Sequence, residues 1–153
     1  VENFLLASTL NVVLAQRLVR KICENCKTAY DPPPELIVDI RNALTTVNDS
    51  QLMLAHDKSV VEAVKKMGQS QVKLYRGTGC TKCGETGYKG RSGIYEVLQV
   101  SENIKRLMLN KTPESEINKV AMEEGMLTLL QDGYIKALEG TTSIEEVLRV
   151  AME

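Results

Sequence analysis

Residues 75–96 read YRGTGCTKCGETGYKGRSGIYE and contain the pair Cys80-x-x-Cys83 among six glycines. A second pair, Cys23-x-x-Cys26, precedes it in the chain. Each pair lets two thiolates bind one metal ion from a single tight turn, and two pairs complete a closed tetrahedral zinc site. Glycine permits the close turns that such a site needs. The sequence therefore predicts one structural Zn²⁺ ion, with no open coordination position for catalysis. Its predicted ligands are Cys23, Cys26, Cys80 and Cys83.

Two other roles for these cysteines are less favoured. A disulfide framework is typical of short secreted chains, and nothing in this sequence indicates secretion. A redox-active Cys-x-x-Cys pair needs a strand–helix setting and has no reason to occur twice. The number of residues between the two pairs exceeds the usual spacing of about 15–20, so the intervening segment must fold or loop out. The only histidine, His56, lies in a polar stretch far from both pairs, and we expect it to be solvated and not a ligand.

Basic residues gather around the second cysteine pair. Residues 65–91 hold seven Lys and Arg against one acid, whereas residues 92–153 hold eleven acids against six bases. A basic stretch can indicate nucleic-acid binding, so a zinc-ribbon nucleic-acid-binding module is the alternative interpretation. The acidic C-terminal third and the scarcity of Phe and Trp for base stacking disfavour it. Four thiolates and one Zn²⁺ carry a formal charge of −2, which Lys82, Lys89 and Arg91 can offset.

The remaining pattern predicts an α+β fold that is mainly α: a zinc-knuckle subdomain with a small β unit, followed by a C-terminal helical bundle. Residues 4–21 are apolar around almost the whole helical circumference, which predicts a buried helix. Alternation over 71–75 predicts a half-buried strand, and we expect 94–98 to pair with it. Further helices are expected over 34–46, 58–67, 102–110, 113–124, 126–138 and 144–152, the last opened by a capping box at Thr142-x-x-Glu145.

Composition fits an ordinary folded protein. The 43% of apolar residues suffices for a core, which must be mainly aliphatic because the chain has one Phe and no Trp. No apolar run approaches the length of about 20 residues that a membrane span needs. The first residues, Val1-Glu-Asn-Phe, have neither an initiator Met nor the basic start of a signal peptide. We therefore expect the chain to be part of a longer protein.

Five stretches resemble one known family. They are residues 1–11, 15–26 and 75–96, GMLTLLQDG at 125–133 and GTTSIEEV at 140–147. They are similar to the C-terminal region of the type II secretion and type IV pilus assembly (extension) ATPases, including its tetracysteine zinc-binding subdomain. The resemblance covers nearly the whole chain except about 35–71. Retraction ATPases of the same superfamily typically lack the paired cysteines, so the resemblance favours the secretion and extension branch.

The resemblance implies a hexameric cytoplasmic motor, peripheral to the inner membrane through its partners, in which ATP hydrolysis drives pilin or pseudopilin assembly. It assigns 1–20 to the end of a RecA-like ATPase domain, 21–92 to the zinc-binding subdomain with a variable insertion at about 35–71, and 93–153 to a helical subdomain. The implied partners are the rest of the parent ATPase, neighbouring subunits of the hexamer and a membrane platform protein. Nucleic acid is not among them.

The motifs for nucleotide hydrolysis are not in this sequence. It contains no Gly-x-x-x-x-Gly-Lys-Ser/Thr loop to hold phosphates, so we expect no catalytic residue and no ATP hydrolysis by this chain alone. ATP and Mg²⁺ are expected only in the parent protein. Gln16, Arg17 and Arg20 are either nucleotide or inter-subunit contacts or the solvated end of a buried helix.

Overall fold

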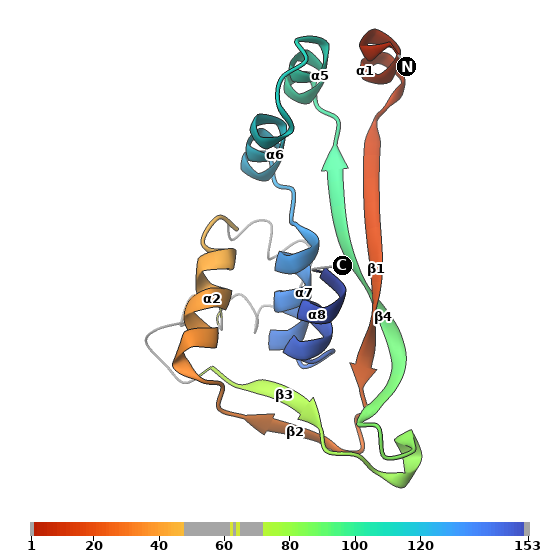
Figure 1. The fold of residues 1–153 in the computed structure, drawn as a ribbon, viewed down its shortest axis with the longest axis vertical. Coiled ribbons are helices and arrows are strands. Elements are labelled where there is room, and N and C mark those ends of the chain that lie inside the picture. The colour runs from red at the N-terminus through yellow and green to blue at the C-terminus, as the bar shows by residue number, and fades with distance from the viewer. Residues whose placement is uncertain (1, 48–61, 63, 65–71, 152–153) are drawn as a thin grey trace.

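The computed structural model describes residues 2–47, 62, 64 and 72–151. This part of the chain forms an α+β fold, as expected, with its helices beside two antiparallel two-stranded ladders (Figure 1). No helix in the described ranges is long and apolar enough to cross a bilayer. In chain order the elements are α1 (Asn3–Thr9), β1 (Val12–Ile22), β2 (Lys27–Tyr30), α2 (Pro34–Leu44), β3 (Leu74–Gly77), the 3₁₀ turn η1 (Thr81–Cys83), β4 (Tyr88–Gln99), α5 (Glu102–Leu109), α6 (Glu114–Glu123), α7 (Leu129–Leu138) and α8 (Ile144–Ala151).

The longer ladder joins β1 to β4. It runs from Val12 opposite Gln99 to Arg20 opposite Arg91, and a register shift then places Ile22 opposite Tyr88. The predicted buried helix over 4–21 is therefore wrong: only its first turns are helical, and the rest is strand. An apolar segment without polar alternation fits a helix and a strand equally. Its β-branched valines favour the extended form once a partner strand is present.

The shorter ladder joins β2 to β3, with Lys27 opposite Gly77 and Tyr30 opposite Leu74. A strand near 71–75 was expected, and β3 lies slightly later. Its expected partner was wrong, because residues 94–98 belong to β4 and pair with β1. Alternation reveals a strand but not its partner. Here each cysteine turn passes the chain from one ladder to the other, so both pairings are non-local.

The helices follow the predicted apolar spacing. Helix α2 begins at Pro34, which suits a first helical position, and lies within the predicted range 34–46. Helix α5 begins after Ser101, whose Oγ accepts a hydrogen bond from the amide of Ile104. The expected helix over 58–67 lies outside the described residues apart from 62 and 64, and His56 lies outside them altogether.

The start of α8 differs from the expected capping box. The helix begins at Ile144 as predicted, but the capping oxygen is Ser143 Oγ, which accepts from the amide of Glu146. The hydroxyl of Thr142 donates instead to the carbonyl of Arg20. A sequence pattern cannot distinguish two adjacent hydroxyl residues when tertiary contacts select one of them.

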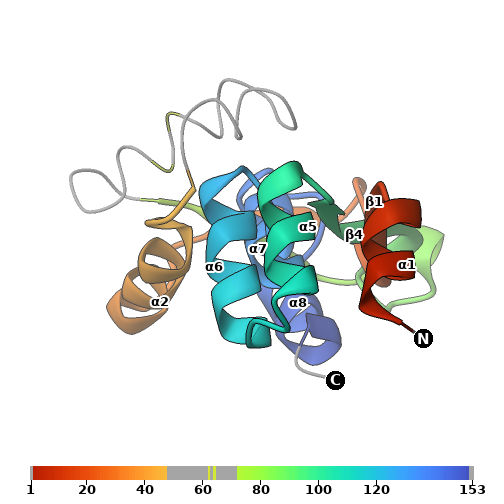
Figure 2. The same ribbon diagram turned by 90° about the horizontal axis from the view of Figure 1, so that it is seen from above.

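The described core consists of separate clusters along the long ladder. One lies at the end where α1 sits beside α5 (Figure 2) and includes Val100, Ile104, Ala121 and Met126. Another packs α2, β3, α7 and α8 together. Position 133 in α7 is occupied by glycine, and a Cβ there would lie 2.5 Å from the side chain of Val147 on α8. Close packing of α7 on α8 thus explains a glycine that weakens the helix pattern.

Candidate metal centre

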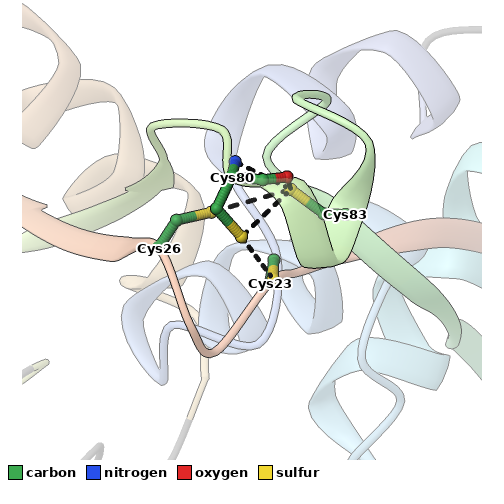
Figure 3. A group of neighbouring side chains, drawn as sticks. All are labelled: Cys23, Cys26, Cys80 and Cys83. Carbon is green, nitrogen blue, oxygen red and sulfur yellow. Dashed lines mark hydrogen bonds between the residues drawn. The ribbon is translucent and has the colours of Figure 1, made fainter.

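The four predicted ligands converge at the junction of the two ladders (Figure 3). All four thiols are free, and their Sγ atoms lie within 4.8 Å of one another. The Sγ–Sγ distances are 3.9 Å for Cys23–Cys80, 3.9 Å for Cys26–Cys83 and 3.7 Å for Cys80–Cys83. Zn–S bonds of about 2.3 Å in a tetrahedron place sulfurs about 3.8 Å apart. A disulfide requires about 2.05 Å. The separations therefore fit a tetrahedral metal ion and not bonded sulfurs.

Two matching turns position the ligands. Cys23 and Cys26 flank the turn between β1 and β2, and the amide of Cys26 donates to the carbonyl of Cys23 at 3.1 Å. Cys83 closes η1 in the same way, its amide donating to the carbonyl of Cys80 at 3.1 Å. Each short turn directs two sulfurs to one side. The local fold thus supplies the ligands in pairs, as their spacing predicted.

Two glycines allow the base of the second turn to close. A Cβ on Gly77 would overlap the backbone of Gly87, and a Cβ on Gly87 would lie 2.6 Å from the carbonyl oxygen of Gly77. The carbonyl of Gly87 accepts the amide of Cys23 at 2.9 Å, which links the second turn to the first. The close backbone approach closes the second turn, and the hydrogen bond from Cys23 to Gly87 holds that turn beside the first.

Backbone amides favour the thiolate form at part of the site. Burial opposes ionisation of Cys83, but the amides of Cys80 and Gly87 donate to its Sγ at 3.2 and 3.3 Å and lower its pKa to about 6. The backbone amide of Asn25 is the main cause of a lowered pKa at Cys23. Burial raises the pKa of Cys26 to about 11. A metal ion displaces such a proton, because the thiolate is the binding form. The donor set fits zinc.

The basic residues of this region have varied surroundings. Lys82 lies in η1 and donates to Asn25 at 3.0 Å, which joins the two turns. Lys89 and Arg91 are exposed on β4. Lys73 pairs with Asp31 at 2.6 Å.

Of the three residues singled out on the N-terminal segment, Gln16 and Arg17 are exposed on β1. Arg20 binds the carboxylate of Glu146 at 2.6 Å and lies over the ring of Tyr88 at 4.2 Å. Glu146 is only 2% exposed. Sequence analysis missed this ion pair. The available signal was an acidic residue four positions before Val150 on the apolar face of α8, because buried acids need partners.

Known proteins are similar to this chain over its whole length. The family described as "Type II/IV secretion system protein" matches residues 1–149. The chain is 36% identical to the type IV pilus assembly ATPase PilB of Thermus thermophilus over 100% of this chain and 15% of the relative. It is 35% identical to the type II secretion system ATPase E of Vibrio cholerae over 100% of this chain and 25% of the relative. It is 33% identical to PilB of Pseudomonas aeruginosa over 100% of this chain and 23% of the relative.

The chain thus spans a quarter or less of the length of these relatives. The similarity extends along the whole chain and so covers the segments that hold both cysteine pairs and the helices that follow them. With the family matched over residues 1–149, the chain belongs to the Type II/IV secretion system protein family.

Proposed function

We propose that this chain is the zinc-binding and helical C-terminal portion of a secretion or pilus assembly motor ATPase, with a structural and interaction role. The observation that carries the proposal is the convergence of four Sγ atoms at tetrahedral separations. Zinc would supply cross-linking of the fold and no catalysis, because four thiolates leave no position for an activated water. Closed sites of this kind contribute on the order of 10 kcal/mol to folding. The proposed ligands are Cys23, Cys26, Cys80 and Cys83.

The topology explains why a cross-link is useful here. The first turn connects β1 to β2, and the second connects β3 to β4, while the ladders pair β1 with β4 and β2 with β3. Both ladders therefore end at the same four sulfurs. The two strands of each ladder are far apart in the sequence, so the entropic cost of loop closure opposes their pairing. A metal ion at the junction would offset that cost.

An exposed apolar face supports a role as part of a larger assembly. Alternate residues of β1 and the opposite residues of β4 share one face of the ladder. On that face Val12, Leu14, Leu18 and Val97 are between 44% and 57% exposed. We call these four residues the open apolar face. We propose that it packs against the rest of the parent ATPase.

The parent is then a hexameric cytoplasmic enzyme that binds ATP and Mg²⁺ and acts on a membrane platform protein to assemble pilin or pseudopilin. The nucleic-acid alternative has less support, because Lys73 and Lys82 already have intramolecular partners. A nucleic-acid binder would lose affinity steeply with salt. We expect titration with DNA and RNA to show no such salt-dependent binding.

The metal role is tested by elemental analysis of the chain purified without chelators. We expect one zinc per chain and its loss in Cys80→Ser, because a hydroxyl is a weak ligand for zinc. Thr81→Ser, in the same turn, is the matched control and should retain the metal. Well below one zinc in the wild-type chain, together with disulfides by mass, would reject the site. In a full-length relative, the equivalent of Cys80→Ser should impair ATP-driven assembly while nucleotide binding persists.

A further inference from the structure

The segment 140–146 comprises the connection after α7 and the first residues of α8, and it contacts three of the strands that lead into or out of the cysteine turns and the residue that follows Cys26. Thr142 and Ser143 in this segment are completely buried. Figure 1 shows α7 and α8 beside the long ladder, on the half nearer the cysteine turns. The contacts fall into three groups, one for each part of the metal-binding unit.

The first group holds the end of β1, immediately before Cys23. The amide of Ile22 donates to the carbonyl of Thr141 at 3.0 Å, and the hydroxyl of Thr142 donates to the carbonyl of Arg20 at 2.8 Å. The amide of Arg20 donates to Glu146 at 3.1 Å. The register shift in β1 lies between Arg20 and Ile22. The segment therefore supplies the hydrogen bonds that a further strand would give to this edge.

The second group holds the chain that leaves Cys83. The hydroxyls of Tyr88 and Ser143 lie 2.7 Å apart and share a hydrogen bond. Tyr88 is the first residue of β4 and follows Gly87, which donates to Cys83 Sγ. The ring of Tyr88 also lies under the guanidinium of Arg20. Ser143 thus contacts the strand that leaves the second cysteine turn, while its neighbour Thr142 contacts the strand that enters the first.

The third group holds the short ladder. Gly140 has φ +73°, and a Cβ there would lie 2.7 Å from Lys27 and 2.8 Å from Tyr75. Lys27 directly follows Cys26, and Tyr75 is in β3, which leads to Cys80. The absence of a side chain at Gly140 lets the segment lie directly against both strands.

We propose that segment 140–146 positions the zinc site, so that Thr142 and Tyr88 are positioning residues for zinc and set its affinity without contacting it. This inference rests on the proposed structural zinc. The sulfurs come from turns 57 residues apart, and only correct placement of both turns brings them to one ion. Docking of the segment and zinc binding must strengthen each other by the same factor, because coupling between sites is reciprocal.

The test measures zinc affinity of the 153-residue chain by competition with a chromophoric chelator. Thr142→Val keeps the shape and removes the hydroxyl donor, and Tyr88→Phe removes the hydroxyl that meets Ser143. We expect each to weaken zinc binding roughly fivefold, the equivalent of one hydrogen bond. Thr142→Ser restores the donor and should bind zinc as the wild type does.

Thr128→Val is the control for general destabilisation. Thr128 caps the other end of α7 through its hydroxyl and makes none of the contacts above. It should lower the free energy of unfolding and leave zinc affinity within about twofold of the wild type. Equal weakening by Thr128→Val would overturn the inference, and so would wild-type affinity in both Thr142→Val and Tyr88→Phe. If Thr142→Val fails to fold, Tyr88→Phe decides. A wild-type chain that binds no zinc would instead reject the proposed zinc role itself, and with it this inference.

Discussion

The guanidinium of Arg20 lies 2.6 Å from the carboxylate of Glu146, although 126 residues separate them in the chain. The glutamate is buried, whereas the side chain of Arg20 is half exposed. Burial alone would raise the pKa of Glu146. Hydrogen bonds from Arg20 and Arg149 and from the amide of Arg20 outweigh burial and lower that pKa to about 2. The ion pair therefore ties the end of β1 to α8 in a pH-dependent way.

Glu146→Gln tests this link. A carboxyl group with a pKa near 4.3 when unfolded and about 2 when folded stabilises the fold fully above about pH 4.5, and this contribution is lost as pH falls towards 2. We expect the variant to lower the free energy of unfolding by about 1.5–3 kcal/mol at pH 6. Below pH 4.5 the difference in free energy of unfolding between wild type and variant should become smaller.

Urea unfolding of both proteins across this pH range measures the difference in their free energies of unfolding. Release of the proposed zinc at low pH should affect both proteins and largely cancel in the difference. Glu145→Gln, at the exposed neighbouring position, is the control and should change stability by less than about 0.5 kcal/mol. A difference in free energy of unfolding that stays constant down to pH 2 contradicts the lowered pKa of Glu146.

Gly77→Ala tests the backbone contact under the second cysteine turn. The new Cβ would overlap the carbonyl of Gly87, so the turn must shift. Overpacking of this kind costs about 1–3 kcal/mol, and we expect zinc affinity to fall about tenfold. Gly90→Ala is the matched control. Gly90 has φ +81° but no atom within 4 Å of an added Cβ, so its substitution strains the backbone and leaves the turn in place. Equal zinc affinities for the two variants would disprove the steric explanation.

The open apolar face predicts self-association when the chain is studied alone. Large exposed apolar patches favour such contacts, and burying a Leu or Val is worth about 1.5–3 kcal/mol. Leu14 and Val97 are opposite one another on this face. Their joint replacement by Thr should weaken association by about tenfold or more, with zinc content unchanged.

Sedimentation equilibrium compares that variant with a control of the same chemistry. Leu109 and Val38 are 51% and 41% exposed on α5 and α2, away from the ladder face. Their joint replacement by Thr should leave association as in the wild type. A strictly monomeric wild-type chain, or equal effects of the two variants, would remove this argument.

The convergence of the four cysteines was predictable from sequence to a degree that the strands were not. Two thiolates three residues apart can share a turn, so the spacing of Cys80 and Cys83 alone predicts their local geometry. Strand pairing depends on contacts between distant segments, and Val12–Ile22 carries no alternation to distinguish strand from helix. Its prediction as a helix failed for that reason.

Helix starts were predictable where the capping group is local, as at Ser101. They were not where a tertiary partner competes for the hydroxyl, as Arg20 does for Thr142. The pairing of Arg20 with Glu146 was equally hidden. Each residue alone suits a solvated helix surface, and only the folded chain brings them together.

Removal of zinc should loosen the structure locally, from the cysteine turns outward. Cys80→Ser should weaken the proposed site, on which we expect the cysteine turns and both strands of the short ladder to depend. The cluster around Ile104 and Ala121, which joins α5 to α6, lies at the other end of the long ladder and shares no residue with the metal-binding turns. We therefore expect faster hydrogen exchange over 22–30 and 74–88, with α5 and α6 still protected.

Hydrogen exchange followed by mass spectrometry of peptides measures this, and a chelator added to the wild-type chain should reproduce the pattern of Cys80→Ser. Glu85→Gln, an exposed change in the same turn, is the control and should exchange like the wild type. Segment 140–146 should show intermediate loss of protection if it is coupled to the metal as proposed. Equal loss of protection in α5 and α6 would mean that the cysteine turns and the helices unfold as one cooperative unit. In that case zinc would stabilise the whole chain and not the junction of the two ladders alone.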